Sequence, residues 1–324
     1  MRVSSKVPPQ FKQTPVLDYL AARFTYRSHD EWADLLAEGR VSGNGRILTP
    51  SDTITQGDLI TCDLPETAPP PTNFDYQIIY EDEWLLGINK PADLRVHGKR
   101  RYAQANLIYH LRRLRQPPYP EATLINRLDK DTSGIILIAR DPETLRLMQQ
   151  LFREKKVEKE YLAVVHGVPD PAAGVIDRPI GQMKSLPGVY RYGVMEGGKT
   201  AVTHYKTIQT FGKPANQPQK HSRNTHHASR ITHFALLRLH PQTGRTHQLR
   251  VHLSALGHPI VGDRLYAMSD AAYLNWCENK TPHPLIQRQA LHSAAVQFRH
   301  PHTEQPLRLT APLPADIQSL ISNL

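Results

Sequence analysis

A proline-rich run divides the chain into two unequal parts. Residues 65–72 read PETAPPPT and contain four prolines. Such a segment behaves as a semi-rigid spacer, because each proline ring fixes its own backbone φ angle. The chain of 324 residues is also long for one domain, since domains commonly run to about 100–200 residues. We therefore predict a domain at residues 1–64, a linker at 65–75 and a second domain at 76–324.

The first part predicts a small ααβ unit. Its apolar residues between positions 15 and 38 recur at helical spacing. The pattern breaks around residues 26–29, which predicts two short helices joined by a turn. Asp30 is placed to cap the second helix. After these helices the sequence changes to short extended pieces separated by turn residues such as Gly43-Asn44-Gly45, which predicts a small sheet.

The second part alternates strand-like and helical patterns, which predicts an α+β domain built on a mixed, largely antiparallel sheet. Helical patterns lie near residues 103–114, 141–154 and 247–256. The predicted strands are 76–80, 84–88, 134–139, 161–165, 202–207, 234–239 and 294–298. Residues 211–230 are polar and basic, and they predict a long loop that is either mobile or in contact with a nucleic acid.

The charge balance favours a polyanionic partner. The chain has 40 Lys and Arg against 30 Asp and Glu, a formal net charge of +10. Such an excess attracts nucleic acid first, with an anionic membrane surface as the alternative. Cys62 and Cys277 suggest neither a disulfide framework nor a thiolate zinc site. The N-terminus has no apolar signal region and no stretch is long enough to span a membrane, so we expect a cytoplasmic protein.

The segment from Asn126 to Gly134 is the strongest candidate for a chemical site. It reads NRLDKDTSG and lies between apolar, strand-like stretches. This places Arg127, Asp129 and Asp131 on a connection beside the predicted sheet. The plain structural interpretation is a turn, since Asp, Thr, Ser and Gly stabilise turns through local hydrogen bonds.

This segment resembles the signature of the RluA-type RNA pseudouridine synthases, His-Arg-Leu-Asp-x-x-Thr-Ser-Gly, in which the aspartate is catalytic. Asn126 stands here where the family usually has histidine, which puts fine positioning in doubt more than activity. The resemblance extends from about residue 76 to 310 through further blocks in the family's order. These are Asn89–Ala92 with Val96-His97, Lys159–Ala163, Gly198–Ala201 with Thr203 and Tyr205, Thr243–Leu253, Gly257–Asp263 and Leu291-His292.

The resemblance implies an enzyme that isomerises uridine in RNA without cofactor or metal. Asp129 would act either as a covalent nucleophile or as a base that takes a sugar proton. In a closed pocket a carboxylate needs a cationic partner to stay ionised, and the resemblance offers Arg250. Arg127 would fill the space of the flipped-out uridine and Tyr161 would stack on its base. The substrate-binding residues implied are Leu291, Lys90, Arg245 and His247, with Arg100 and Arg101 as phosphate contacts.

Ribosomal RNA is the favoured substrate, because the two-domain layout resembles that of the family's ribosomal-RNA members, and transfer RNA is the alternative. The N-terminal unit resembles the small RNA-binding domain of ribosomal protein S4, through its helix pair and through residues 39–45 with Gly57-Asp58. We expect a monomer. The rival class is a non-catalytic RNA-binding or ribosome-assembly protein, which would have no need of the four catalytic-site residues together.

Two other signals are set aside. Residues 193–200, GVMEGGKT, match the spacing of a phosphate-binding loop. The pattern requires a helix after it, whereas the residues that follow alternate like a strand. None of the 17 histidines stands in an HExxH or zinc-finger spacing, so no metal site is predicted.

Overall fold

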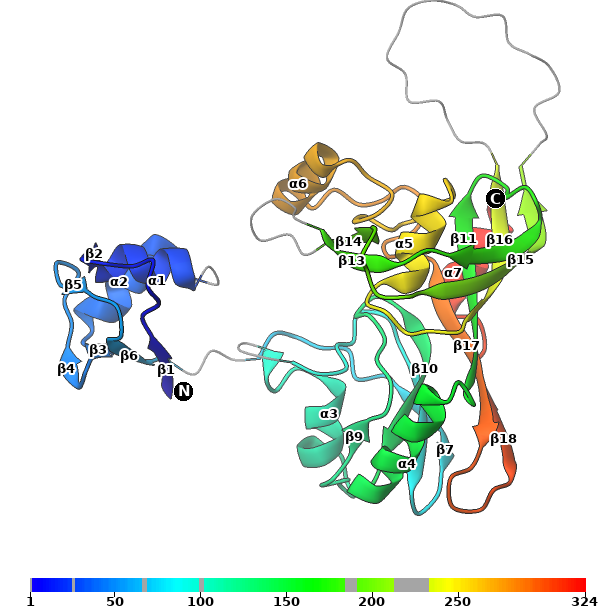
Figure 1. Cartoon of the computed structure of the whole chain (residues 1–324), viewed down its shortest axis with the longest axis horizontal. Coiled ribbons are helices and arrows are strands. Elements are labelled where there is room, and N and C mark those ends of the chain that lie inside the picture. The colour runs from blue at the N-terminus through cyan, green and yellow to red at the C-terminus, as the bar shows by residue number, and fades with distance from the viewer. Residues whose placement is uncertain (1, 25–26, 66–68, 99–101, 184–190, 213–232) are drawn as a thin grey trace, which may run out of the picture. The chain divides into compact units, whose positions relative to one another are not determined.

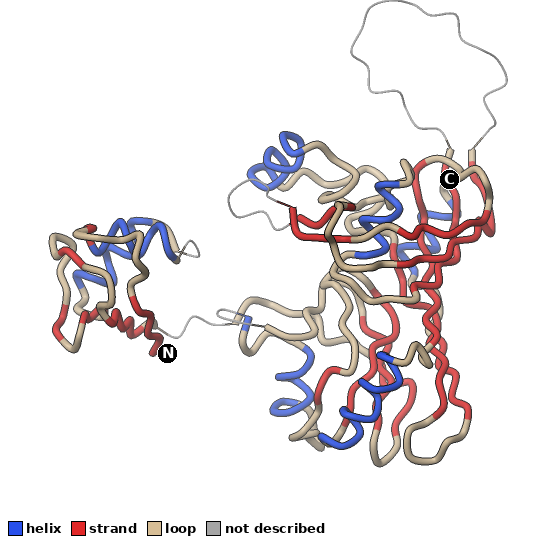
Figure 2. Tube along the Cα trace, viewed as in Figure 1, coloured by secondary structure: helices blue, strands red, loops and turns tan. Residues whose placement is uncertain are grey.

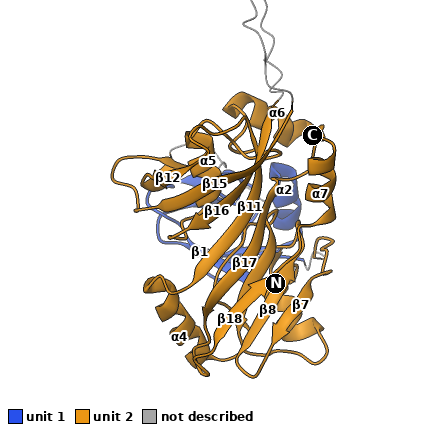
Figure 3. Ribbon diagram, turned by 90° about the vertical axis from the view of Figure 1, so that its right-hand side faces the viewer, with its two compact units in different colours: residues 1–68 blue, residues 69–324 orange. Residues whose placement is uncertain are grey.

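The computed structural model forms two compact units, residues 1–68 and 69–324, each described here by itself (Figure 3). Among the residues outside the description are Arg100 and Arg101, two of the predicted phosphate contacts, and most of the predicted 211–230 loop. Within the described part of the chain, no helix is long and apolar enough to cross a membrane. The described residues are 2–24, 27–65, 69–98, 102–183, 191–212 and 233–324.

The first unit packs two helices on a small sheet. Helices α1 (Val16–Arg23) and α2 (His29–Ala37) bury Tyr19, Leu20 and Trp32 in a core of their own. Ser28, and not Asp30, caps α2: its side chain accepts from the Glu31 N–H while Glu31 accepts from the Ser28 N–H. This capping box satisfies two backbone donors at once. The strands are β1 (Arg2–Lys6), β2 (Thr14–Pro15), β3 (Val41–Gly43), β4 (Arg46–Ile47), β5 (Thr53–Ile54) and β6 (Leu59–Asp63).

The second unit is built on one long, mixed sheet with the strand order β12-β15-β16-β11-β17-β10-β8-β7, to which β18 and β9 are added (Figure 1). All of its strand pairs are antiparallel except β10 with β17. The predicted α+β class and largely antiparallel sheet are confirmed. The strands are β7 (Gln77–Glu81), β8 (Leu85–Lys90), β9 (Thr123–Leu124), β10 (Ser133–Ala139), β11 (Glu158–His166), β12 (Ala173–Asp177), β15 (Val202–Phe211), β16 (Phe234–Pro241), β17 (Leu291–Arg299) and β18 (Pro306–Thr310). A separate hairpin joins β13 (Ile180–Met183) to β14 (Arg191–Val194).

Helices lie against this sheet and at its ends (Figure 2). Asp141 caps the amphipathic α4, whose Met148 enters one core cluster. Helix α7 buries Ile317 and Leu320 in the other, larger cluster. The helices are α3 (Leu107–Tyr109), which continues into the π-helix η2 (His110–Leu114), α4 (Pro142–Arg153), α5 (Gln248–Ala255), α6 (Asp270–Asn279) and α7 (Ala315–Ser322).

Strands β10 and β17 meet over only two residue pairs, Ser133 with His292 and Gly134 with Ser293, which we call the seam. Gly134 has φ +105°, and a Cβ atom there would lie 2.2 Å from the Ser293 carbonyl oxygen. Only glycine allows this close approach without a clash. The seam therefore explains the glycine at the end of the 126–134 segment, and it fixes where the connection before β10 lies.

Candidate active site

A cavity of about 1060 Å³ opens beside the connection between β9 and β10. Its walls come from that connection, from β11 and β17, from the end of α4 and from the start of α5. Most of the residues singled out from the sequence meet in it. They are Arg127, Asp129, Tyr161, Arg245, His247, Arg250 and Leu291.

The connection that carries Asp129 is held by hydrogen bonds on both sides. The Thr132 N–H donates to the Asp129 carbonyl at 3.2 Å, and the buried Thr132 hydroxyl accepts from Gln289 Nε2 at 3.0 Å. Upstream, the Asn126 side-chain oxygen accepts from the Leu137 N–H of β10 at 2.8 Å. Asn126, the departure from the family signature, thus anchors the connection to the sheet. The Asp129 side chain is left 29% exposed, which allows it to meet a substrate.

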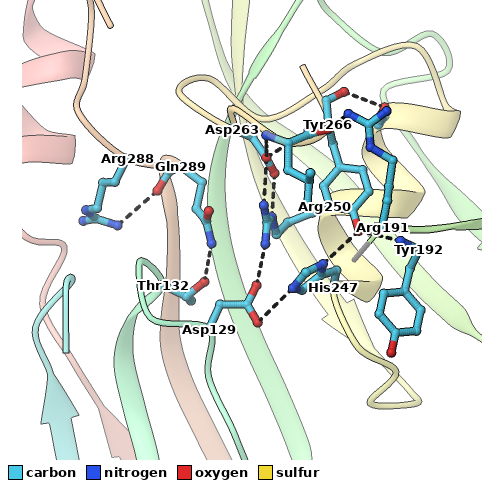
Figure 4. A network of polar contacts seen from close by, with 12 residues as sticks. Asp129, Thr132, Arg191, Tyr192, His247, Arg250, Asp263, Tyr266, Arg288 and Gln289 are labelled. Atoms are coloured by element: carbon cyan, nitrogen blue, oxygen red, sulfur yellow. Dashed lines mark hydrogen bonds and ion pairs between the residues drawn. The ribbon is translucent and has the colours of Figure 1, made fainter. Parts of the chain in front are cut away.

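Arg250 on α5 holds Asp129 and a second carboxylate together (Figure 4). Its Nη1 donates to Asp129 Oδ2 at 2.9 Å, while Nε and Nη2 donate to the two oxygens of Asp263 at 2.6 and 2.9 Å. Burial disfavours the charged form of Arg250, but the hydrogen bonds and charges of Asp263 and Asp129 outweigh it and raise its pKa. The guanidinium is therefore a permanent cation beside Asp129, as the sequence led us to expect.

Asp263 is the functional residue that sequence reasoning missed. Its side chain is fully buried, and besides Arg250 it accepts from the N–H groups of Leu265 and Tyr266 at 3.0 and 3.1 Å. A buried carboxylate of this kind fixes the orientation of the guanidinium fork that it binds. The available signal was its place in the block Gly257–Asp263, where it had been matched to the family without a role.

His247 lies at the start of α5 on the opposite side of Asp129. Its backbone is left-handed, with φ 56°, and its side chain lines the cavity. Nε2 lies 3.8 Å from Asp129 Oδ1 and Nδ1 lies 2.8 Å from the Tyr266 hydroxyl. Burial lowers the pKa of His247 despite the neighbouring carboxylate, so the ring is mainly neutral at pH 7.

Tyr161 forms an apolar, aromatic wall of the cavity together with Leu291. A β-bulge at Glu160/Tyr161 interrupts the pairing of β11 with β17, and bulges beside active sites commonly re-aim a side chain. Burial raises the pKa of Tyr161 to about 12, and its side chain is hydrogen-bonded to Ser293. The phenol is therefore neutral, and its ring offers a face suited to stacking.

The basic residues differ in their placement. Arg127 and Arg245 are exposed at the cavity, and Arg245 Nε donates to the Thr200 carbonyl at 2.9 Å. Lys90 does not reach the cavity: it is fully buried, and Nζ donates to the carbonyls of Pro91, Leu94 and Lys130. The expectation that Lys90 binds substrate is corrected accordingly, because a side chain with three protein acceptors supports the connection that carries Asp129 instead.

Within the described part of the chain, no group of three or more His, Cys, Asp or Glu side chains is placed to hold a metal ion.

The sequence model of the family described as "RNA pseudouridylate synthase" matches residues 85–255. The chain is 31% identical to ribosomal large subunit pseudouridine synthase D of Pseudomonas aeruginosa, over 95% of this chain and 91% of that protein. It is 33% identical to the protein of the same name from Vibrio cholerae, over 92% and 87%. The solved structure of human RNA pseudouridylate synthase domain containing 4 is similar with a TM-score of 0.53 and 28% identity, covering 76% of this chain and 91% of that one.

Proposed function

The chain belongs to the RNA pseudouridylate synthase family and is an RNA pseudouridine synthase, and on this premise we propose that it converts uridines of ribosomal RNA to pseudouridine with Asp129 as the catalytic carboxylate. The observation that supports this assignment is the Asp129–Arg250–Asp263 ion-pair chain in the cavity. A carboxylate paired with a guanidinium in a cavity that also has apolar walls is the kind of group that this isomerisation needs.

The reaction is an exchange of bonds at the same sugar carbon. The N1–C1′ bond of uridine breaks, the uracil turns, and a C5–C1′ bond forms. The hydrogen at C5 leaves as a proton, and N1 gains a proton in its place. No oxidant or phosphoryl donor takes part. Asp129 is the only acidic residue among those that line the described cavity, so we assign it both the interaction with the sugar and the stabilisation of the positive charge that develops there when the first bond breaks.

The surrounding residues receive supporting roles. The target uridine leaves its base stack at a cost of a few kcal/mol, and exposed Arg127 takes its place beside the neighbouring bases. Tyr161 stacks on the detached uracil, which must be held while it turns, and Leu291 closes the apolar wall. Arg245 binds a phosphate at the rim. Asp263 keeps the fork of Arg250 directed towards Asp129.

Ribosomal RNA is proposed as the substrate because the relatives from Pseudomonas aeruginosa and Vibrio cholerae are named for the ribosomal large subunit. We further propose that the first unit is an S4-like RNA-binding domain. Its support is the helix pair packed on a small sheet. In this role the first unit would provide a second contact with the RNA substrate. We place the protein in the cytoplasm, where ribosomal RNA is made.

Tritium release from RNA that carries 5-tritiated uridine tests the proposal, since the new C5–C1′ bond expels that hydrogen. We expect the wild type to release tritium from an unmodified large-subunit ribosomal RNA transcript and Asp129→Asn to release none while binding the same RNA. A transfer RNA transcript serves as the rival substrate. Release by Asp129→Asn at the wild-type rate would reject Asp129, and release from transfer RNA alone would reject the ribosomal assignment.

A further inference from the structure

The C-terminal end of α4 forms a basic wall of the same cavity that the proposed reaction leaves without a role. Gln149, Phe152, Arg153 and Lys155 all line the cavity. Helix α4 packs against β9 and β10 (Figure 1), the two strands whose connection carries Asp129. This wall is therefore part of the second unit's own scaffold.

Lys155 stands where a helix of this kind usually has glycine. Its φ is +57°, its N–H donates to the Phe152 carbonyl, and the Lys156 N–H donates to the Leu151 carbonyl. These two bonds are those of the Schellman motif, which ends a helix through a left-handed residue. A left-handed backbone disfavours every residue with a side chain relative to glycine. Lysine at this position costs backbone free energy relative to glycine, and its side chain lines the cavity.

The three cations at this end of α4 differ in their partners. Lys156 pairs with Glu154 through Nζ and Oε2 at 2.7 Å and is not among the residues that line the cavity. Arg153 and Lys155 are exposed, and among the described residues neither forms an ion pair. Their charges are thus free to meet an anion that enters the cavity.

Phe152 adds an aromatic surface to this wall. It is partly buried against the core cluster of Met148 and Leu137, yet it also lines the cavity. Lys159 Nζ lies 5.9 Å from the centre of its ring. An aromatic face between basic side chains is the arrangement by which proteins bind unpaired nucleotides, since the ring stacks on a base of any sequence and the cations bind phosphates.

We propose that residues 152–155 form a subsite for a nucleotide next to the target uridine, with Phe152 stacking on its base and Arg153 and Lys155 binding its phosphates. The subsite rests on the proposed function, because it takes the cavity to be occupied by RNA. It selects RNA in which this neighbouring nucleotide is unpaired. A paired neighbour keeps its base inside the duplex stack, where Phe152 does not reach it.

Lys155→Gly tests the phosphate contact without damage to the fold. Glycine suits the left-handed position, so we expect the full-length variant to have a thermal midpoint equal to or above that of the wild type. Its affinity for a short fluorescein-labelled oligouridylate should fall. The slope of log Kd against log salt should decrease by about 0.7, the value of one phosphate contact on a single strand. Lys156→Ala, which removes the same charge one residue away, should bind within about twofold of the wild type.

Phe152→Leu tests the stacking, because leucine preserves the packing against the core. We expect its affinity for the oligouridylate to fall by about 5- to 150-fold, the equivalent of about 1–3 kcal/mol for one stacked base. Its affinity for a blunt RNA duplex should stay near the wild-type value.

These binding measurements separate the subsite from the chemistry, because oligouridylate affinity is read without turnover. Failure of tritium release by the wild type would remove the proposed function and leave the binding results interpretable. Unchanged affinity and salt slope for Lys155→Gly, or an equal loss for Lys156→Ala, would overturn the phosphate contact. An equal loss of single-strand and duplex affinity in Phe152→Leu would overturn the stacking.

Discussion

The guanidinium of Arg250 binds two carboxylates, those of Asp263 and Asp129, and this arrangement determines how Asp129 is positioned. Asp263 takes Nε and Nη2, so that only Nη1 is directed at Asp129. A single charge-assisted bond restrains Asp129 and leaves its second oxygen available. The ring of Tyr266 lies 4.9 Å from the guanidinium carbon and limits its movement on one side.

Asp263→Asn should therefore lower kcat more than it raises KM. The asparagine keeps the shape of the side chain but presents an NH₂ group to the guanidinium, so Arg250 shifts towards Asp129 and misplaces it. We expect a loss of about 10- to 100-fold in single-turnover tritium release, since a misplacement of about 1 Å costs up to about 100-fold. Asp75→Asn, at an exposed position, is the matched control. A change confined to KM would contradict the positioning role of Asp263.

Acidification should slow the reaction through His247. Burial lowers the pKa of His247 below 6.5, so the ring is neutral at pH 7 and gains its proton only as the pH falls through that lowered value. The imidazolium then lies 3.8 Å from Asp129 Oδ1 and engages the oxygen that the substrate needs. His247→Gln should lose this acid limb in a pH series of single-turnover rates. An unchanged limb in that variant would assign the titration to another group.

Sequence reasoning at this scale identified Asp129 and its partner Arg250, because both occur in long motif blocks. It misplaced Lys90, since a motif match does not indicate whether a side chain faces a cavity or the backbone beneath it. Asp263 was part of the matched block Gly257–Asp263 but received no role. Its role depends on a contact with Arg250 across 13 positions of the chain.

At the scale of elements, the strands with continuous apolar runs were predictable and the marginal elements were not. Strands β8, β10 and β17 are mostly buried, and β11 is buried at Tyr161 and at residues 163–165, so each left a run of apolar residues in the sequence. Helix α6 has no buried residue and therefore no apolar periodicity to detect. Helix α7 is short and follows a proline, and β18 is mostly exposed at the sheet margin.

Helix α7 is tied to the Asp129 connection through Arg288. The buried guanidinium binds Asp316 of α7 in a bidentate manner at 2.7 and 2.9 Å. Its Nη1 also donates to the carbonyls of Asp131 and Leu291, each at 3.2 Å. The next residue, Gln289, holds Thr132 (Figure 4). One short segment thus braces both the connection and the apolar wall.

Arg288→Ala should destabilise the protein by about 2–4 kcal/mol in urea unfolding, because it leaves buried carbonyl groups without donors. Turnover should fall as well, since the Asp131 carbonyl loses its support. Asp316→Asn is the comparison: it weakens the pair at a carboxylate that is 44% exposed and spares the carbonyl contacts, so its effect should stay below about 1 kcal/mol. Equal effects of the two substitutions would show that Arg288 acts only through its ion pair with Asp316 of α7.

At the scale of the whole molecule, each unit has its own hydrophobic core. The cluster around Trp32 belongs to residues 1–68, whereas the clusters that include Ile136 and Leu137 belong to residues 69–324. The proline-rich run was sufficient to suggest a division of the chain. The sequence could not predict the long sheet's strand order, because that order joins segments far apart in the chain.

A shortened protein of residues 69–324 should fold by itself and keep the kcat of the intact chain, since every described residue of the cavity lies within it. Its affinity for a large-subunit ribosomal RNA transcript should fall and become less dependent on salt, because the proposed S4-like contacts are gone. Circular dichroism, binding titrations and tritium release together check this. Undiminished affinity would remove the RNA-binding role proposed for the first unit.

The short seam between β10 and β17 affects how substitutions can change the turnover rate of the enzyme during evolution. Two residue pairs join the strands there, while one continuous apolar cluster, with Ile136 on one side and Val164 on the other, packs across both halves of the sheet. Packed interiors respond to a change of even one methylene, so a substitution within this cluster is expected to shift one half of the sheet relative to the other. Asp129 precedes β10 in one half of the sheet, and Arg250 lies on α5, which follows β16 in the other half. Substitution of one buried aliphatic residue by another can therefore change kcat in small steps during evolution while Asp129 and Arg250 stay unchanged.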